Sequence, residues 1–143
     1  MSGHRLTTDA SPRELLSRTK TIAVVGLSPK PQRPSHQVSA YLQKAGYRVI
    51  PVHPAARTIL GERAFASLAE AEAEVGDIDL VDVFRRNDAL PELVGEVIAL
   101  RPQALWLQLG VTHPEAEAAV LEAGVDLVAD RCTLVEHRRL LPG

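Results

Sequence analysis

The chain has 143 residues, a formal net charge of -2 and a single cysteine, Cys132. This length suits one compact domain, and the small negative charge gives no electrostatic basis for nucleic-acid binding. A lone cysteine excludes an intramolecular disulfide and indicates a reducing compartment. The sequence has neither a membrane-length apolar run nor a signal-peptide pattern, so we expect a cytoplasmic protein that does not enter a membrane.

Strand and helix patterns alternate along the chain, beginning with the β-branched, apolar run Thr21–Val25. This run predicts a first strand that ends at Gly26. After a loop, we expect Ser35 to be the N-cap of a helix that closes at Gly46. Arg48–Val52 predicts the second strand.

The remaining elements follow the same alternation, although residues 53–76 have a less clear pattern. Here we expect a loop, a short strand near residues 64–65 and a helix from about Ser67 to residue 74. The later predicted elements are strands over residues 80–84, 104–109 and 125–129, and helices that begin at Asp88 and at His113 or Pro114. Residues 132–140 are expected to form a short helix or an irregular tail.

This alternation predicts an α/β fold, a single Rossmann-like, doubly wound domain with about five mostly parallel strands. Scarce aromatic residues and abundant Ala, Leu and Val also favour helices packed on a parallel sheet. We expect residues 1–19 to form an N-terminal helix or arm and residues 20–140 to form the Rossmann-like core of one domain spanning 1–143.

The loop after the first strand has the order of a pyrophosphate site: a strand, a glycine turn and a helix start. The second and third glycines of a dinucleotide site are absent, since Ser28 and Pro31 occupy those positions. The acidic residue that binds a ribose diol is also absent, because His53 follows the second strand. The sequence therefore predicts an anionic ligand other than ordinary NAD.

Basic residues follow most of the predicted strands, at the sheet edge where open parallel sheets bind ligands. Any one of them could be an ordinary solvated loop residue, but together with the first loop they favour a phosphate-rich ligand. They are Lys30, Arg33, Arg57, Arg85, Arg86 and Arg131.

Several other residues suggest no chemistry of their own. The five histidines lack metal-site spacing, so we expect no metal centre. His36 is either a phosphate contact or an exposed first-turn residue, and Trp106 is expected in the core. Asp79 and Asp82 flank an apolar run, and nothing pairs them as acid and base.

Five short blocks, spread from about residue 20 to residue 139, form a more specific pattern than any single motif. The blocks are Val25-Gly26-Leu27-Ser28-Pro29-Lys30 with Arg33-Pro34-Ser35; residues 46–54; Asp82-Val83-Phe84-Arg85; residues 106–111; and Asp130-Arg131-Cys132 with Val135-Glu136-His137. Together they resemble the small CoA-binding proteins whose Rossmann-like domain also forms the N-terminal part of the succinyl-CoA synthetase alpha subunit.

The resemblance implies coenzyme A or an acyl-CoA as ligand. It places the pyrophosphate on the first loop and Ser35, and the adenosine or its 3′-phosphate near the residues after the second strand. The pantetheine would pass Phe84, Arg85 and the turn at 108–110. The candidate CoA-binding residues are Gly26, Leu27, Ser28, Lys30, Arg33, Ser35, His36, His53, Pro54, Arg57, Phe84, Arg85, Arg86, Gln108 and Gly110.

Cys132 has two interpretations: an inert core thiol, or a redox thiol at the ligand edge whose pKa Arg131 would lower. The favoured function is a non-catalytic CoA-binding protein without enzymatic activity of its own. One alternative is a CoA-linked enzyme component, either an acyl-CoA synthetase subunit or a protein that uses Cys132 in CoA thiol and disulfide chemistry. An NAD(P)-dependent oxidoreductase is less favoured. A homo-oligomer and a larger enzyme partner both remain open.

Overall fold

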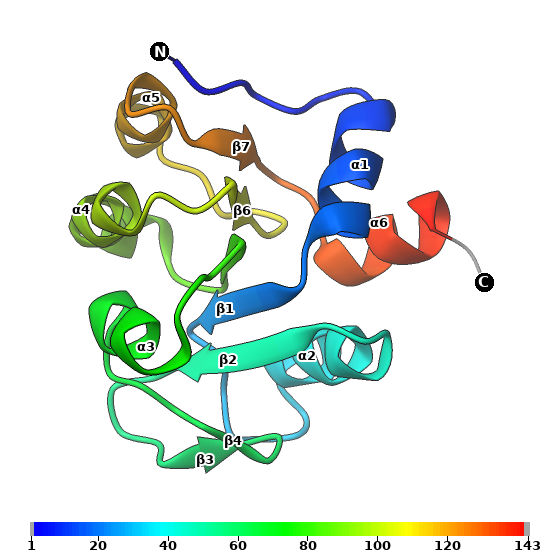
Figure 1. The fold of residues 1–143 in the computed structure, drawn as a ribbon, viewed down its shortest axis with the longest axis vertical. Helices are drawn as coiled ribbons and strands as arrows, with labels where there is room; N and C mark the ends of the chain where they lie inside the picture. The colour runs from blue at the N-terminus through cyan, green and yellow to red at the C-terminus, as the bar shows by residue number, and fades with distance from the viewer. Residues whose placement is uncertain (1, 142–143) are drawn as a thin grey trace.

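A five-stranded parallel sheet forms the centre of the computed structural model, which describes residues 2–141 (Figure 1). Its strands are β1 (Thr21–Val25), β2 (Arg48–Val52), β5 (Leu80–Val83), β6 (Ala104–Leu107) and β7 (Asp126–Val128). They pair in the order β2-β1-β5-β6-β7, and every pair is parallel. This arrangement confirms the predicted Rossmann-like α/β domain.

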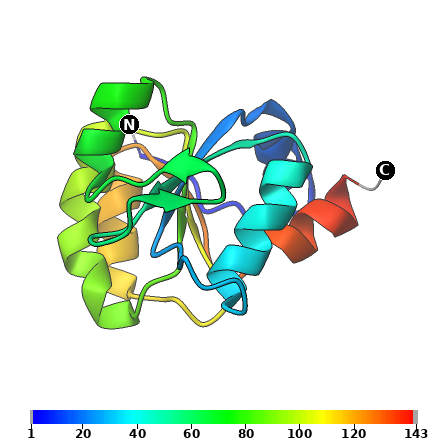
Figure 2. The same cartoon turned by 90° about the horizontal axis from the view of Figure 1, so that it is seen from below.

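Six α-helices cover the two faces of the sheet in two layers (Figures 1 and 2). One layer contains α3 (Leu68–Val75), α4 (Leu90–Leu100) and α5 (Pro114–Glu122). The other contains α1 (Ala10–Arg18), α2 (Pro34–Lys44) and α6 (Thr133–Leu140). No helix within residues 2–141 is both long and apolar enough to cross a membrane.

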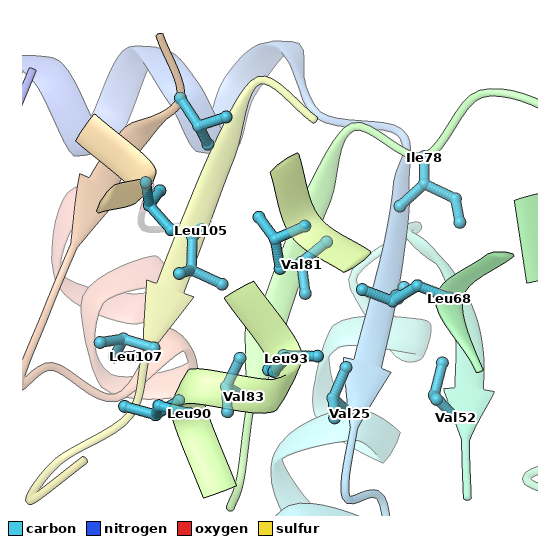
Figure 3. Close-up of a cluster of buried hydrophobic side chains, with 14 of the residues drawn as sticks. Val25, Val52, Leu68, Ile78, Val81, Val83, Leu90, Leu93, Leu105 and Leu107 are labelled. Atoms are coloured by element: carbon cyan, nitrogen blue, oxygen red, sulfur yellow. The ribbon is translucent and has the colours of Figure 1, made fainter. Parts of the chain in front are cut away.

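The central strands are apolar because both of their faces are buried. In β1, Ala23 and Val25 pack toward α3, α4 and α5, whereas Ile22 and Val24 pack toward α1, α2 and α6. Figure 3 shows the first of these clusters, in which Val25 lies near side chains of the neighbouring strands and of α4. Asp82 is the exception in β5: it is fully buried between two valines.

Two predicted helix starts are wrong by a few residues. Arg33, not Ser35, is the N-cap of α2, and Pro34 is its first residue because the fixed φ of proline suits that position. The expected N-cap Asp88 lies instead in the 3₁₀ turn η1 (Asn87–Ala89) that precedes α4. Its exposed carboxylate lies 3.4 Å from Arg86 Nε and caps no helix.

Two predicted strands are also shifted. The strand expected over residues 104–109 ends at Leu107, and Leu109 is 65% exposed. The strand expected near residues 64–65 lies slightly earlier, where β3 (Thr58–Ile59) and β4 (Glu62–Arg63) form an antiparallel hairpin. Phe65 then forms an isolated bridge with Val52 of β2.

Candidate functional site

The order of the strands creates a crevice at the carboxyl ends of β1 and β5. The chain leaves β1 toward β2 on one side, whereas β5 pairs on the other, and ligands of doubly wound sheets bind at such a switch point. Gly26 lies at this point with a φ of 88°, and a Cβ there would collide with the carbonyl oxygen of Phe84. Only glycine therefore allows the two strand ends to approach this closely.

The loop after Gly26 is tied to the first turn of α2 by short hydrogen bonds. The Ser28 amide donates to Ser35 Oγ at 3.0 Å, and the Lys30 amide donates to Ser28 Oγ at 3.1 Å. His36 Nδ1 lies 2.9 Å from the Ser28 carbonyl oxygen, to which its N–H donates. These bonds hold the loop against the helix N-terminus, where anions bind favourably.

A pocket of about 840 Å³ opens at the crevice, a volume in the range of sites that hold large ligands. It brings together most of the predicted CoA-binding residues and Cys132. The predicted residues that line it are Gly26, Ser28, Lys30, Arg33, Ser35, His53, Phe84, Arg85, Arg86 and Gln108. Sequence reasoning did not include five further lining residues in its candidate set: Pro29, Pro34, Val38, Leu109 and Val111.

Five predicted residues do not line this pocket: Leu27, His36, Pro54, Arg57 and Gly110. Leu27 is fully buried in the core beneath α2, so it supports the loop from below. The Gly110 amide donates to the Asp130 carboxylate at 2.8 Å, which joins the turn after β6 to the loop after β7.

The cations of the pocket differ in their partners. Within residues 2–141, Lys30, Arg33 and Arg85 form no ion pair with a carboxylate. Arg86 lies near Asp88, and both side chains are exposed. Unpaired cations beside a pocket give it a positive potential that favours an anionic ligand.

Arg131 does not line the pocket, although the sequence predicts it among the cations of the ligand edge. Its guanidinium donates to Glu136 Oε1 at 2.8 Å and to the Thr7 carbonyl oxygen at 3.0 Å. Hydrogen bonds from Arg139 and Arg131 hold the pKa of the Glu136 carboxyl below its usual value despite its burial. Arg131 therefore anchors α6 and the N-terminal segment.

His53 lines the pocket after β2 and has a fixed tautomer. Its Nδ1 accepts hydrogen bonds from the amides of Ala55 and Ala56, at 3.1 and 3.0 Å. An accepting Nδ1 leaves the imidazole proton on Nε2. His53 therefore offers an N–H donor.

A buried polar network lies behind Gln108, and sequence reasoning missed it. Gln108 Nε2 donates to Asp82 Oδ1 at 2.6 Å and to Thr133 Oγ1 at 2.9 Å. The Thr133 hydroxyl donates to Asp82 Oδ2 at 3.0 Å. Burial raises the pKa of Asp82 to about 7, although these hydrogen bonds oppose the rise. A carboxylate within an otherwise apolar strand was the available signal, since a buried charge needs partners.

Cys132 is half-buried at the pocket and precedes the first residue of α6. Trp106, which is in the core as predicted, donates its indole N–H to the Arg131 carbonyl oxygen at 2.8 Å. This bond fixes the backbone immediately before Cys132. No group of three or more His, Cys, Asp or Glu side chains in the described part of the chain is placed to hold a metal ion.

A comparison with known families adds to this geometry: the sequence profile of the CoA binding domain matches residues 20–138. The chain belongs to the CoA-binding domain family. The matched region contains every strand of the sheet and every residue that lines the pocket.

The most informative relatives are bacterial proteins of similar length. The uncharacterized protein YneT of Bacillus subtilis (strain 168) is 42% identical over 125 residues, which cover 87% of this CoA-binding domain protein and 90% of YneT. The solved structure of cell-free ID.343 from Thermus thermophilus is 47% identical, with a TM-score of 0.89, and the match covers 94% of this chain and 100% of that chain.

A more distant likeness concerns the fold alone. The dinucleotide-forming acetyl-coenzyme A synthetase 1 of Ca. Korarchaeum cryptofilum is 17% identical, with a TM-score of 0.69. The match covers 80% of this chain but only 26% of the synthetase chain. The same α/β architecture therefore also occurs as one part of a larger enzyme.

Proposed function

We propose that this protein binds coenzyme A or an acyl-CoA without catalysing a reaction, and that the loop after β1 and the N-terminal end of α2 hold the phosphates. One observation carries this proposal: a single pocket joins this loop to the carboxyl ends of β5 and β6 and to Cys132 before α6. The family membership is consistent with this ligand.

The phosphate end of the proposed site consists of donors and cations. Lys30 and Arg33 are exposed and free of ion pairs within residues 2–141, and the Ser35 hydroxyl keeps its own proton to donate. Charge-assisted hydrogen bonds to phosphate are stronger than neutral ones, and the helix dipole adds to them.

Apart from Arg85 and Arg86, the other lining residues suit an uncharged arm. Phe84, Val38, Leu109 and Val111 contribute apolar surface, and Gln108 contributes an amide. Pantetheine combines methyl and methylene groups with amides, so both kinds of lining residue have a counterpart in it.

The hydroxyl groups at the pocket support binding rather than catalysis. Ser35 Oγ accepts from the Ser28 amide, and Ser28 Oγ accepts from the Lys30 amide, so both oxygens shape the loop. His53 Nδ1 is likewise occupied by backbone amides and is not a free base. A nucleophilic mechanism needs a hydroxyl beside a free base, and His53 is the one histidine that the described residues contribute to the pocket lining.

A second candidate function is thiol and disulfide chemistry with CoA, and the position of Cys132 favours it. This cysteine lines the pocket and is only half-buried. A Cys132 thiolate would attack one sulfur of CoA disulfide, form a protein–CoA mixed disulfide and release the second CoA as a thiolate.

Calorimetric titration with CoA, acetyl-CoA, NAD and NADP tests the main proposal. We expect CoA and acetyl-CoA to bind with micromolar or tighter dissociation constants and NAD to give no binding heat, because Ser28 and Pro31 replace glycines of a dinucleotide turn. Equal affinities for CoA and NAD would reduce the proposal to a general nucleotide site. Absence of binding by CoA and acetyl-CoA would refute it.

A further inference from the structure

The side-chain amide of Gln108 is held in one orientation by buried partners. An amide nitrogen has two N–H donors, and those of Gln108 are directed to Asp82 Oδ1 and Thr133 Oγ1. Asp82 and Thr133 are fully buried, and Gln108 is 5% exposed. Within residues 2–141, Gln108 Oε1 has no hydrogen-bond partner, and it is not among the wholly buried atoms that lack one. Because Gln108 lines the pocket, Oε1 is the polar atom that it offers there.

The reversed orientation of the amide is unfavourable. It would place Gln108 Oε1 against Asp82 Oδ1, and two acceptors would then face each other without water. Protonation of Asp82 on Oδ2 does not change the orientation of the Gln108 amide. The Oδ2 hydroxyl would then donate to Thr133 Oγ1. Oδ1 then remains an acceptor for the Gln108 amide nitrogen.

The hydrogen-bonding character of the pocket is thus different at its two ends. Lys30, Arg33, the Ser35 hydroxyl and His53 Nε2 are donors and form the donor end, and Arg85 and Arg86 after β5 add further cationic donors to the lining. Gln108 Oε1 is an uncharged acceptor, and it forms the acceptor end. A ligand that satisfies both ends carries an anionic group and, at a distance from it, a neutral N–H or O–H donor.

We propose that Gln108 Oε1 is a specificity-determining acceptor that selects ligands with an amide N–H in their uncharged arm, and that Asp82 and Thr133 act as positioning residues for it. This inference rests on the proposed function and deepens it. In CoA, the pantetheine arm provides the amide N–H groups, whereas the nucleotide half provides the phosphates. Gln108 therefore recognises the pantetheine arm and not the nucleotide half.

The test compares three ligands by calorimetry with the complete chain: CoA, its nucleotide half 3′-phospho-ADP, and a CoA analogue in which esters replace both pantetheine amides. We expect the unaltered protein to bind CoA at least tenfold more tightly than the ester analogue, because an ester has no N–H for Gln108 Oε1. In Asp82→Leu, no acceptor remains at this position for the Gln108 amide nitrogen, and we expect the preference for CoA over the ester analogue to fall below threefold. Affinity for 3′-phospho-ADP should change less than twofold.

Thr133 provides a matched pair of variants, because serine keeps the hydroxyl and valine removes it. We expect Thr133→Ser to retain the tenfold preference and Thr133→Val to reduce it. Equal binding of CoA and the ester analogue by the unaltered protein would overturn the inference, even if no variant folds, and would leave the proposed function intact. A full preference in both Asp82→Leu and Thr133→Val would overturn the positioning roles. Failure of both CoA and 3′-phospho-ADP to bind would overturn the proposed function together with this inference.

Discussion

The buried carboxyl of Asp82 should make the stability of the protein decrease as the pH rises from about 4 to about 7. Its pKa is raised from 3.8 to about 7 in the fold, chiefly by burial. Between these two values the folded protein keeps a proton that the unfolded chain releases, so the free energy of unfolding falls with pH. A difference of about 3 pH units, at about 1.4 kcal/mol each, corresponds to about 4 kcal/mol.

Three other groups make the protein more stable as the pH rises, so the experiment has to separate their contributions from that of Asp82. The pKa values of Glu117 and Glu136 are lowered in the fold, so their contribution to stability is lost as the pH falls below about 4.5. Burial lowers the pKa of His137, so stability from this group increases as the pH rises toward 6.5. Comparison with Asp82→Asn cancels these contributions, because the variant retains all three groups.

Urea unfolding at pH 5, 6, 7 and 8, followed by the fluorescence of the fully buried Trp106, provides the measurement. Relative to Asp82→Asn, the unaltered protein should lose about 1.4 kcal/mol of unfolding free energy per pH unit from pH 5 to 7. The difference between the two proteins should level off above pH 7. Asp77→Asn, at an exposed position, serves as the control and should show no such slope. Parallel pH profiles for the unaltered protein and Asp82→Asn would refute the reasoning.

Three other predictions concern the pocket and its backbone. Arg33→Ala should weaken CoA binding by about 1.5–3 kcal/mol in calorimetry without lowering the ligand-free melting temperature. Arg13→Ala, on the exposed side of α1, is the control, and an equal loss of CoA affinity in both variants would count against a phosphate contact. CoA disulfide should add one CoA in intact-mass spectra, and Cys132→Ser should abolish the adduct; labelling only after denaturation would identify a structural thiol. Gly26→Ala should lower the unfolding free energy by at least about 2 kcal/mol, and a smaller loss than in Gly46→Ala, where a Cβ meets open space, would contradict the steric argument.

The sheet was predictable from sequence because its strands are buried on both faces. Such strands consist of short apolar runs, and turn residues such as Gly26 mark their ends. The first loop was predictable for a related reason, since the order of strand, glycine turn and helix start is local in the sequence. Most of its candidate residues do lie around one pocket.

The contacts of Arg131 and Asp82 that sequence reasoning missed depend mostly on partners far along the chain. Arg131 follows a strand, as a ligand-binding cation would, but its guanidinium is bonded to Glu136 and to the carbonyl oxygen of Thr7. The sequence pattern assigned Asp82 no partner, because its partners come from a later strand end and from α6. No local spacing reveals such contacts, since only the folded chain brings these segments together.

The two outer strands of the sheet are each covered by another part of the chain. Beside β7, the Leu6 amide donates to the Leu127 carbonyl oxygen, and the Leu127 amide donates to His4. Beside β2, the Phe65 amide donates to the carbonyl oxygen of Pro51, a residue that itself lacks an N–H. These contacts protect the sheet from edge-to-edge aggregation. They leave helix faces and loops, rather than strand addition, as the surfaces through which this chain can associate with a second copy or with an enzyme.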